Sequence, residues 1–513
     1  MKNKKGFTLI ELLAVIIILA VIALIATPIV LNVVDNARKS ANKDSAYGLL
    51  DSAKLYYMES LLDKSKSLSG NLIDKINVSG SKPDSGTVYI NDKGEIALSV
   101  VYDKVCFTKN YEDADLTESD DIKNCIVTVP RELYKDTVLN GADPELKDNI
   151  VAVTINTDGT VKKADIYSEW YNYTNKTWAN AVLLNGNDTY KVGDTIIEDA
   201  IKAYYVWIPR YKYQIFYDGT NATSKQLINI EFENKNTTKS NGTTKDGWLT
   251  HPAFTFGDTE LNGIWVGKFE LTGDTTNPTI KPNIASLRNT NVSTLFLTTQ
   301  KLSSNSAMLK NSEWGAVAYL TTSIYGQGLN EVRINNSSKY ITGCASTKEN
   351  GDSYSGCQNT YNTSIGYLAS TTGNISGIYD MSGCSFEYVM GVMEDSLNSN
   401  TPSSGTRTQY NSGFTGKNLD DNTTTAGVAF PESKYYDIYK YGTSNSDLTR
   451  YHLGDATGEV KGWNSDYAIF VYSLSPWFIR GGYYSYRNGA GVLSFDNIYG
   501  SGGSNYSARA VLR

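Results

Sequence analysis

The chain has 513 residues, 40% of them hydrophobic and 20% charged, which suits roughly two to four folded domains. Its formal net charge of −7 and its pI near 5.2 argue against a body that coats nucleic acid, so we expect no direct nucleic-acid binding. The 37 tyrosines and 43 glycines favour a turn-rich β architecture, and around the only two histidines, His251 and His452, there is no metalloprotease or Ser-His-Asp signature.

The first 35 residues combine a short basic segment with a long apolar one. Three lysines precede an apolar run over 12–26, and the apolar character continues to Val34. At about 1.5 Å per residue, a helix over 7–34 exceeds the ~30 Å hydrocarbon core, so it is predicted to cross a membrane. A secretory signal would place its small residue after the apolar run, whereas Gly6 stands before it. Glu11 would cost roughly 2.5–3.5 kcal/mol in mid-membrane unless its charge is compensated.

The segment K-K-G-F-T-L-I-E-L-L, residues 4–13, resembles the class III leader of type IV pilins and type II secretion pseudopilins. The resemblance implies that prepilin peptidase cuts between Gly6 and Phe7 and that the new amine of Phe7 is methylated. Glu11 would then pair with this amine of a neighbouring subunit on entering a filament. Pro28 also matches the family pattern and, because it lacks an N–H, can loosen or melt the helix. The implied parts are a leader over 1–6, a pilin helix over 7–60 with its membrane part at about 7–34, a body outside the cytoplasmic membrane, and other pilin subunits as partners.

After Asp35 the helix is predicted to become amphipathic and to dock on a small pilin-like β domain over 61–130. The docking stripe recurs at three- and four-residue intervals and consists of Ala46, Leu49, Leu50, Ala53, Tyr56 and Tyr57. Residues 86–102 predict a β-hairpin, because two strand-like runs flank the turn residues at 91–94.

The five cysteines predict two short-range disulfides rather than a metal site, because none forms a C-x-x-C pair. The predicted bridges are Cys106–Cys125 and Cys344–Cys357, and such a bond typically contributes ~2–4 kcal/mol. Cys384 stands alone, and a cysteine of this kind is more often a small buried residue than a nucleophile.

Residues 131–203 are predicted to be a linker and a β-rich connecting region. A polar stretch that contains N-G-A-D-P at 140–144 marks the boundary, and the strand-like run at 150–155 begins a new element.

From Tyr204 to Arg513 the sequence resembles the formylglycine-generating-enzyme-like family, whose fold is related to C-type lectins. The phrases that carry the resemblance occur in the family's order: H-P-A-F-T-F at 251–256, I-W-V-G-K-F-E-L-T at 264–272, W-G-A-V-A-Y-L at 314–320, G-I-Y-D-M-S-G at 377–383 with E-Y at 387–388, I-R-G-G at 479–482 and A-R-A-V-L at 508–512. The resemblance implies a large α+β, C-type-lectin-like domain over 204–513.

Departures from the family pattern argue against catalysis. Cys384 replaces the usual asparagine of the central signature, and Phe386 and Tyr388 replace the usual tryptophans. Oxidase members need a C-terminal cysteine pair to bind copper, and no cysteine follows Cys384. We therefore predict no enzyme, no catalytic residue and no metal site. The residues that match the family are predicted to be scaffold: Asp380, Gly383, Glu387, Arg480, Gly481, Gly482 and Arg509.

The C-terminal tract concentrates aromatic and amide groups, which suit sugars or protein epitopes. Its candidate ligand-binding residues are Tyr483, Tyr484, Tyr486, Arg487, Asn488, Asp496, Asn497, Tyr499, Asn505 and Tyr506. The tract also resembles the C-terminal tract that diversity-generating systems vary in related folds. The alternative is that these tyrosines pack within the domain, as we expect for about half of them. No cofactor is predicted; calcium at an Asp- and Asn-rich loop over 419–423 stays open, because the loop lacks a defined ligand spacing.

The sequence thus predicts an α+β protein in which a long transmembrane pilin helix packs on a small antiparallel sheet and a large C-type-lectin-like domain follows. The preferred function is a minor, tip-located pilin that displays a binding head for a surface glycan or protein ligand, with adhesion as the output. One alternative is a pseudopilin of a secretion or DNA-uptake apparatus with a protein-binding head. The less favoured alternative is a formylglycine-generating-like enzyme.

Overall fold

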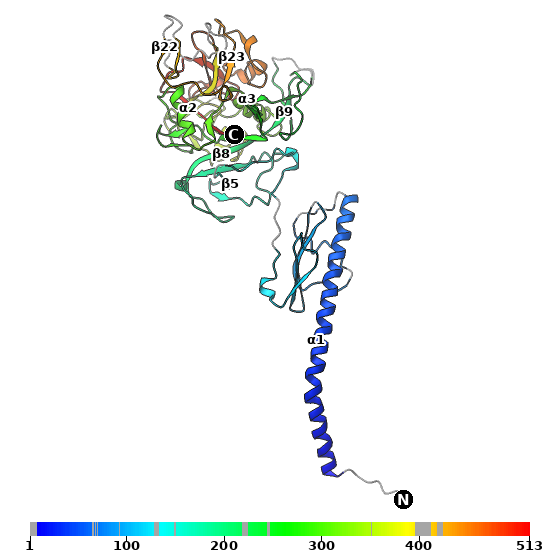
Figure 1. Cartoon of the computed structure of the whole chain (residues 1–513). Helices are drawn as coiled ribbons and strands as arrows, with labels where there is room; N and C mark the ends of the chain where they lie inside the picture. Colours follow the sequence, from blue (N-terminus) through cyan, green and yellow to red (C-terminus); the bar gives the residue numbers. More distant parts are fainter. Residues whose placement is uncertain are drawn as a thin grey trace. The chain divides into compact units, whose positions relative to one another are not determined.

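The computed structural model describes residues 8–63, 66, 68, 70–78, 80–91, 93–127, 133–147, 150–217, 224–243, 247–349, 351–394, 412–417 and 424–513, without the side chains of 416–417 and 424–425. The chain divides into two compact units, Met1–Glu132 and Leu133–Arg513, and each has its own hydrophobic core (Figure 1). The architecture is α+β, as predicted. The predicted cleavage residues Gly6 and Phe7 lie outside the described residues.

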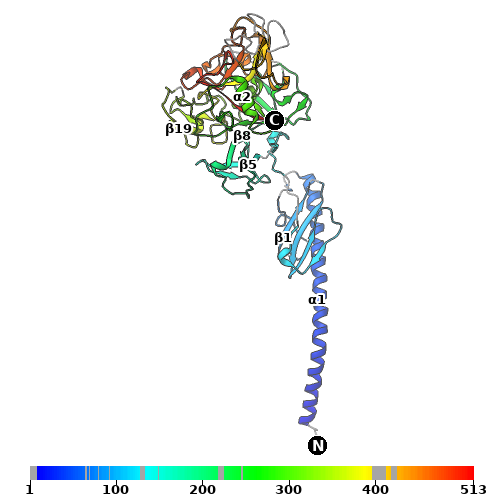
Figure 2. The ribbon, with the colours of Figure 1, turned by 60° about the vertical axis from the view of Figure 1, so that its left-hand side comes forward.

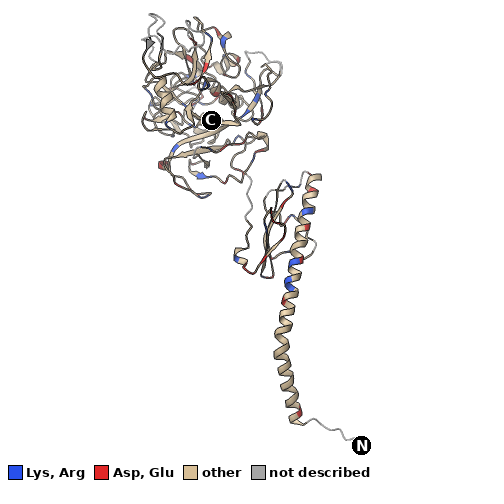
Figure 3. Cartoon of the chain, viewed as in Figure 1, with Lys and Arg blue, Asp and Glu red and all other residues tan. Residues whose placement is uncertain are grey.

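One helix, α1 (Leu9–Leu62), dominates the first unit. Its most apolar 18-residue window has a mean hydropathy of 3.2, and among the residues that the structure describes it is the one helix long and apolar enough to cross a membrane. Figure 3 shows that charged residues are concentrated in its C-terminal half, with Glu11 near its start. The helix passes through Pro28 without a break, so the loosening expected there is not a feature of this structure. The hydroxyl of the preceding residue, Thr27, donates to the carbonyl of Ala23 at 2.5 Å.

The C-terminal half of α1 packs on a four-stranded antiparallel sheet (Figure 2). The strands follow one another in the order β1 (Ser85–Ile90), β2 (Ile96–Tyr102), β3 (Val105–Lys109) and β4 (Thr117–Ser119). The predicted hairpin is β1–β2, with Ile90 opposite Ile96. Five of the six stripe residues are buried against this sheet, and the sixth, Tyr57, is half-buried. The core of the unit begins at Ala46, so α1 before that residue contributes no buried side chain among those described.

The second unit is built on a seven-stranded sheet whose order is β17-β27-β14-β8-β7-β5-β6. The strands in chain order are β5 (Ile150–Ile155), β6 (Val161–Lys163), β7 (Asn180–Leu184), β8 (Ile201–Pro209), β14 (Gly263–Gly267), β17 (Ser306–Met308) and β27 (Ala510–Leu512). Residues 131–203 were expected to connect two domains, but β5, β6 and β7 belong to this sheet because β7 pairs with β8 along five residues. The compact unit therefore begins at Leu133 rather than Tyr204.

A second sheet carries the C-terminal tract. In chain order it contains β20 (Phe386–Met393), β23 (Asp437–Tyr439), β24 (Trp477–Arg480), β25 (Phe495–Ile498) and β26 (Tyr506–Ala508). The remaining strands form small ladders: β9 (Tyr211–Gln214), β10 (Asn229–Phe232) and β11 (Leu249–Thr250); β12 (Thr255–Phe256) with β13 (Thr259–Glu260); β15 (Thr272–Gly273) with β16 (Pro278–Thr279); β18 (Cys344–Ala345) with β19 (Asn359–Thr360); and β21 (Gly416–Lys417) with β22 (Thr424–Thr425).

Two α-helices pack into the same core, α2 (Val292–Gln300) and α3 (Asn311–Thr321). Helix α3 covers the W-G-A-V-A-Y-L phrase at 314–320, and all of its side chains are buried. The core of this unit therefore surrounds a helix rather than only lying against one face of it.

Two disulfides close short loops, as predicted. Cys106 is bonded to Cys125 in the first unit, and Cys344 is bonded to Cys357 in the second. Cys384 is free and buried.

Candidate functional site

An ion pair between Arg509 and Glu387 lies in the core of the second unit. Both side chains are fully buried, with Nη2 to Oε1 at 2.5 Å and Nε to Oε2 at 3.0 Å. Arg509 also donates to the carbonyls of Gly267 at 2.8 Å and Tyr379 at 2.9 Å. Its guanidinium thus links β20 to two other chain segments, and a ligand would have to displace these bonds to reach it.

Two further carboxyl groups surround this pair. Asp380 accepts hydrogen bonds from the side chain of Asn335 at 2.8 Å and the N–H of Gly343 at 2.9 Å. Burial raises the pKa of Asp380, and burial with repulsion from Glu387 raises that of Glu270 well above its usual range. Because one arginine faces three carboxyl groups, Glu270 is expected to hold a proton at neutral pH.

Cys384 lies in the same cluster and is a poor nucleophile. Its pKa is raised well above the ordinary value by burial and by the neighbouring carboxyl of Glu270. The thiol therefore stays protonated and buried, without the thiolate that covalent catalysis requires.

The predicted scaffold glycines occupy backbone conformations that suit glycine. Gly383, Gly481 and Gly482 have φ values of +83°, +81° and +70°. A Cβ on Gly383 would also lie 2.5 Å from the carbonyl oxygen of Asn335. These glycines allow the chain to turn beside the second sheet.

Arg480 in β24 is fully buried and has mostly carbonyl partners. It donates to the side chain of Asn311 at 2.7 Å and to the carbonyls of Asp455, Ala456 and Ser494 at 2.9–3.0 Å. Burial lowers the pKa of Arg480 to about 10, so it remains a cation at neutral pH. Its donors are occupied inside the fold.

The two histidine rings pack against aromatic neighbours. His251 is fully buried, which lowers its pKa to about 3, and its Nδ1 accepts the N–H of Ala253 at 3.2 Å. The ring of His452 stacks on that of Tyr439 at 4.4 Å between centroids. Both rings serve in packing.

Glu459 is a buried carboxyl that no sequence motif marks. It accepts hydrogen bonds from the N–H of Gly454 at 2.5 Å and from the hydroxyls of Tyr319 at 2.8 Å and Tyr213 at 3.2 Å. Burial raises its pKa to about 7. A carboxyl with such a pKa could exchange protons at neutral pH, but it is enclosed and contacts no nucleophile among these partners.

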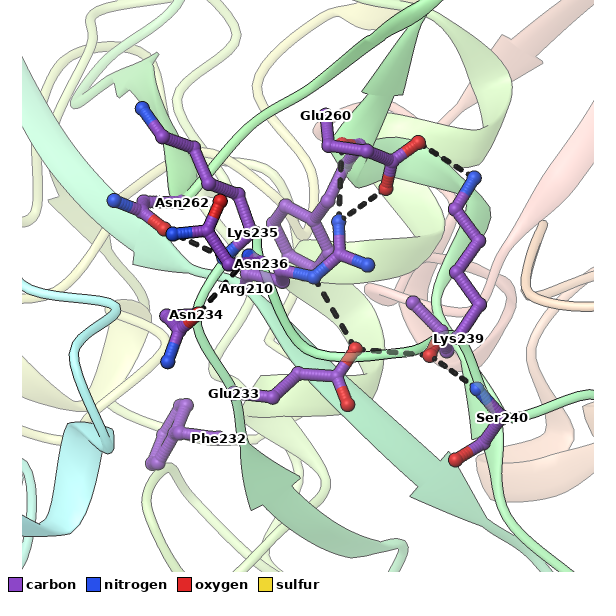
Figure 4. Close-up of polar contacts among 12 residues, drawn as sticks. Arg210, Phe232, Glu233, Asn234, Lys235, Asn236, Lys239, Ser240, Glu260 and Asn262 are labelled. Carbon is purple, nitrogen blue, oxygen red and sulfur yellow. Dashed lines mark hydrogen bonds and ion pairs between the residues drawn. The ribbon is translucent and has the colours of Figure 1, made fainter.

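Figure 4 shows a third buried arginine, Arg210, between two acidic residues. Its Nε lies 3.2 Å from Glu233 and its Nη1 lies 2.6 Å from Glu260. Lys239 also pairs with Glu260, at 2.6 Å. Arg210 immediately follows β8 and Glu233 follows β10, so this network ties the three-stranded ladder to the main sheet.

Among the described residues, the hydrogen-bond partners of Lys268 include no carboxylate. Its Nζ donates to the side chain of Asn180 and to the carbonyls of Ile375 and Gly377 at 2.6–2.9 Å. Burial lowers its pKa well below the usual value. In the sequence this lysine is one position of the phrase at 264–272, and its burial depends on distant segments.

A cavity of about 260 Å³ opens beside the end of β5. It is lined by Val153, Thr154, Ile155, Thr157, Trp170, Thr177, Trp178, Asn180, Tyr367, Asn374, Ile375 and Ser376. The side chains of Asn180, Asn374 and Ser376 are hydrogen-bonded within the protein. The cavity therefore offers mainly apolar walls.

Seven aromatic rings form a continuous, partly exposed cluster, which we call the aromatic surface. Its members are Tyr340, Phe386, Tyr467, Tyr483, Tyr484, Tyr486 and Tyr506, and neighbouring centroids are 5.0–6.0 Å apart. Phe386 is buried, Tyr467 is exposed, and the other tyrosines of the cluster are partly exposed. Four of the members belong to the predicted tract; Tyr340, Phe386 and Tyr467 come from other segments. Aromatic rings held in this way provide contact area at a low entropic cost.

The other tract residues divide between this surface and the fold. Asp496 accepts the hydroxyl of Tyr486 at 3.2 Å, so it belongs with the aromatic surface. Arg487 is exposed and pairs with Asp352 at 2.7 Å. Asn497 instead donates to the carbonyl of Phe470 at 2.8 Å, which ties it into the domain. The last three are Asn488 and Tyr499, which are exposed, and Asn505, which is partly buried.

The described end of α1 places Glu11 beside Thr8. The carboxylate accepts the N–H of Thr8 at 2.8 Å and its hydroxyl at 2.9 Å, and the Thr8 hydroxyl accepts the N–H of Glu11 at 3.3 Å. This is a capping box, so Glu11 stabilises the first turn of the helix as well as supplying a negative charge there.

The chain carries the prokaryotic N-terminal methylation motif. This family matches residues 1–27. Together with α1, the match supports a pilin-like or pseudopilin subunit and implies processing by a prepilin peptidase and assembly with other pilins. It suggests a structural subunit rather than an enzyme, and it fits a membrane-anchored protein that later forms a surface filament.

No curated protein matches the chain. Two similar solved structures are the Major Tropism Determinant I1 Variant and the Major Tropism Determinant U1 Variant. The first has 11% identity and a TM-score of 0.27, with 83% of each chain covered. The second has 10% identity and a TM-score of 0.26, with 86% of this chain and 97% of that chain covered. Scores this low do not establish a shared fold.

No cluster of three or more His, Cys, Asp or Glu arranged to hold a metal ion occurs among the described residues. The loop over 419–423, raised above as a calcium candidate, lies outside them. Within the described chain, the aromatic surface is thus the best candidate for a functional site of the second unit.

Proposed function

We propose that this protein is a minor pilin-like subunit in which the unit Leu133–Arg513 is a lectin-like head that binds a surface ligand in adhesion. The aromatic surface is the observation that carries the proposal. It gathers tyrosines from the C-terminal tract on a unit whose buried ionic groups are bonded internally. Loops fixed on a rigid core are a common place for recognition.

The separation of the chain into two units supports a division of labour. The first unit supplies α1 and a small sheet, and the second has an independent core more than large enough to fold as a domain. We propose that the first unit assembles with other pilins while the second remains available for a ligand. A head of this size would crowd a repetitive shaft, which favours a tip or occasional position.

The binding proposal is tested with the full chain in detergent micelles on an array of glycans and extracellular-matrix proteins, with and without calcium. We expect a reproducible hit that Tyr484→Ala abolishes. The matched control is Tyr167→Ala, because Tyr167 is 42% exposed but lies outside the tract and the aromatic surface. A blank array from a folded protein, or equal losses in both variants, would contradict the proposal and favour a head that contacts only partner pilins.

The position in the filament is tested separately by immunogold labelling of the second unit on intact cells. Gold confined to filament ends or to rare positions is the expected result. Uniform labelling along the shaft would exclude the tip position without affecting the binding result.

A further inference from the structure

The aromatic surface contains one carboxylate without a cationic partner among the described residues. Asp496 in β25 accepts the hydroxyl of Tyr486 at 3.2 Å and the N–H of Asn497 at 2.8 Å. The negative charge of Asp496 helps to raise the pKa values of Tyr467, Tyr486 and Tyr506. No described Lys or Arg forms an ion pair with Asp496. Two accepted bonds leave further lone pairs on a carboxylate.

The nearby arginines are already engaged. Arg487 pairs with Asp352, and Arg288 lies over the ring of Tyr340 at 3.9 Å from its centroid. Tyr340 in turn packs against Tyr484 at 5.1 Å. The surface therefore already holds one cation, the guanidinium of Arg288, against a tyrosine ring.

We propose that the aromatic surface recognises a partner protein through a lysine side chain, whose ammonium group lies against the tyrosine rings and pairs with Asp496. This inference rests on the proposed binding function of the head. Ring faces attract cations, and the carboxylate supplies the opposite charge at their edge. A protein is favoured over a glycan because the site is a broad surface rich in tyrosine, and tyrosine-rich surfaces of this kind are typical of protein-binding paratopes.

The electrostatics around Asp496 agree with recognition of a cation. Burial raises the pKa of Asp496 to about 6. An ammonium group beside it would favour the charged form, so binding is expected to weaken as the pH falls below 6. The titratable groups that face Asp496 are the hydroxyls of Tyr467, Tyr486 and Tyr506, whose pKa values are raised, so they stay neutral over this range.

The test uses the full chain in detergent micelles at physiological salt and four immobilised polymers: poly-L-lysine, its acetylated form, chitosan and chitin. We expect binding to poly-L-lysine, loss of binding on acetylation, and a roughly tenfold weakening by Asp496→Asn. Asp352→Asn is the matched control, since it removes the same charge from an exposed carboxylate that pairs with Arg487. Circular dichroism and the thermal midpoint establish that both variants are folded.

Four results would overturn the inference: no binding to poly-L-lysine, binding that survives acetylation, equal weakening by Asp496→Asn and Asp352→Asn, or stronger binding to chitosan than to poly-L-lysine. If the array gives a hit that depends on Tyr484 but not on Asp496, the binding head stands and only the lysine inference falls. If the array is also blank, the proposed function falls with it.

Discussion

Removing Arg509 tests whether the core of the second unit depends on its buried ion pair. We consider Arg509→Met, which keeps an unbranched side chain of comparable length and deletes the charge. The change leaves the fully buried carboxyl of Glu387 unpaired and frees the carbonyls of Gly267 and Tyr379. Breaking a buried pair from one side typically costs about 3–5 kcal/mol, and each freed acceptor adds about 1 kcal/mol. We expect a loss of about 5–7 kcal/mol in the free energy of unfolding.

Protonation of Glu387 would relieve part of this cost. Its pKa is about 7 even beside Arg509, because burial outweighs the arginine, and it would rise further in Arg509→Met. A buried acid with a raised pKa takes up a proton on folding, so stability falls as the pH rises from the unfolded value of 4.5. Arg509→Met should therefore lose more stability at pH 8 than at pH 5.

The assay is urea unfolding of a soluble version that begins at Asn36, followed by tryptophan fluorescence; this version keeps every buried residue of both cores. Glu387→Gln, alone and with Arg509→Met, completes a double-mutant cycle. In the Glu387→Gln background, where the partner side chain is neutral, Arg509→Met should cost only about 1–2 kcal/mol, the share of the freed carbonyls. Equal costs in both backgrounds, or a loss below about 1 kcal/mol in the wild-type background, would refute the ion-pair reasoning.

Three further predictions concern other parts of the chain. The pKa of Glu459 rises from 4.5 in the unfolded chain to about 7 in the fold, so the free energy of unfolding of the wild type should fall by about 3 kcal/mol as the pH rises from 4.5 to 7. Glu459→Gln should remove this pH dependence. Unfolding of both proteins at pH 4.5 and pH 7 checks the prediction. Replacing Cys106 and Cys125 by serine should lower the free energy of unfolding of the first unit by ~2–4 kcal/mol. The mass shift of the wild type on alkylation, with and without reductant, checks that the bond is present. Glu11→Gln should leave the protein in the membrane but out of filaments, as fractionation and sheared-filament blots would show; wild-type filament levels would contradict its assembly role.

The features predicted correctly from sequence are set by local chemistry. The stripe from Ala46 to Tyr56 follows helical periodicity, and each disulfide joins cysteines fewer than 20 residues apart. The hairpin β1–β2 needed only two strand-like runs and a turn. The hairpin and the disulfides have all their partners nearby in the sequence, and the stripe is visible from helical periodicity alone, so local patterns were sufficient.

The features that were missed depend on distant partners. The strands within 131–203 were assigned to a connecting region because nothing local shows that β7 pairs with β8. Lys268 is buried by segments about 90 and 110 residues away. Four of the seven rings of the aromatic surface lie in the C-terminal tract that was singled out from the sequence. Others, such as Tyr340 and Tyr467, reach this tract only through the tertiary fold.

The contrast between core and surface explains how the second unit could accept changes at the aromatic surface, its proposed binding face. The buried arginines are bonded to carboxyl and carbonyl groups inside the unit, whereas rings such as Tyr484 contact mainly each other. Losing a core partner leaves a buried charge or acceptor, at several kcal/mol, but losing a half-exposed ring leaves neighbours that water can reach. Substitutions at the aromatic surface should therefore alter binding more readily than folding. That separation of stability from recognition would suit the binding head proposed above.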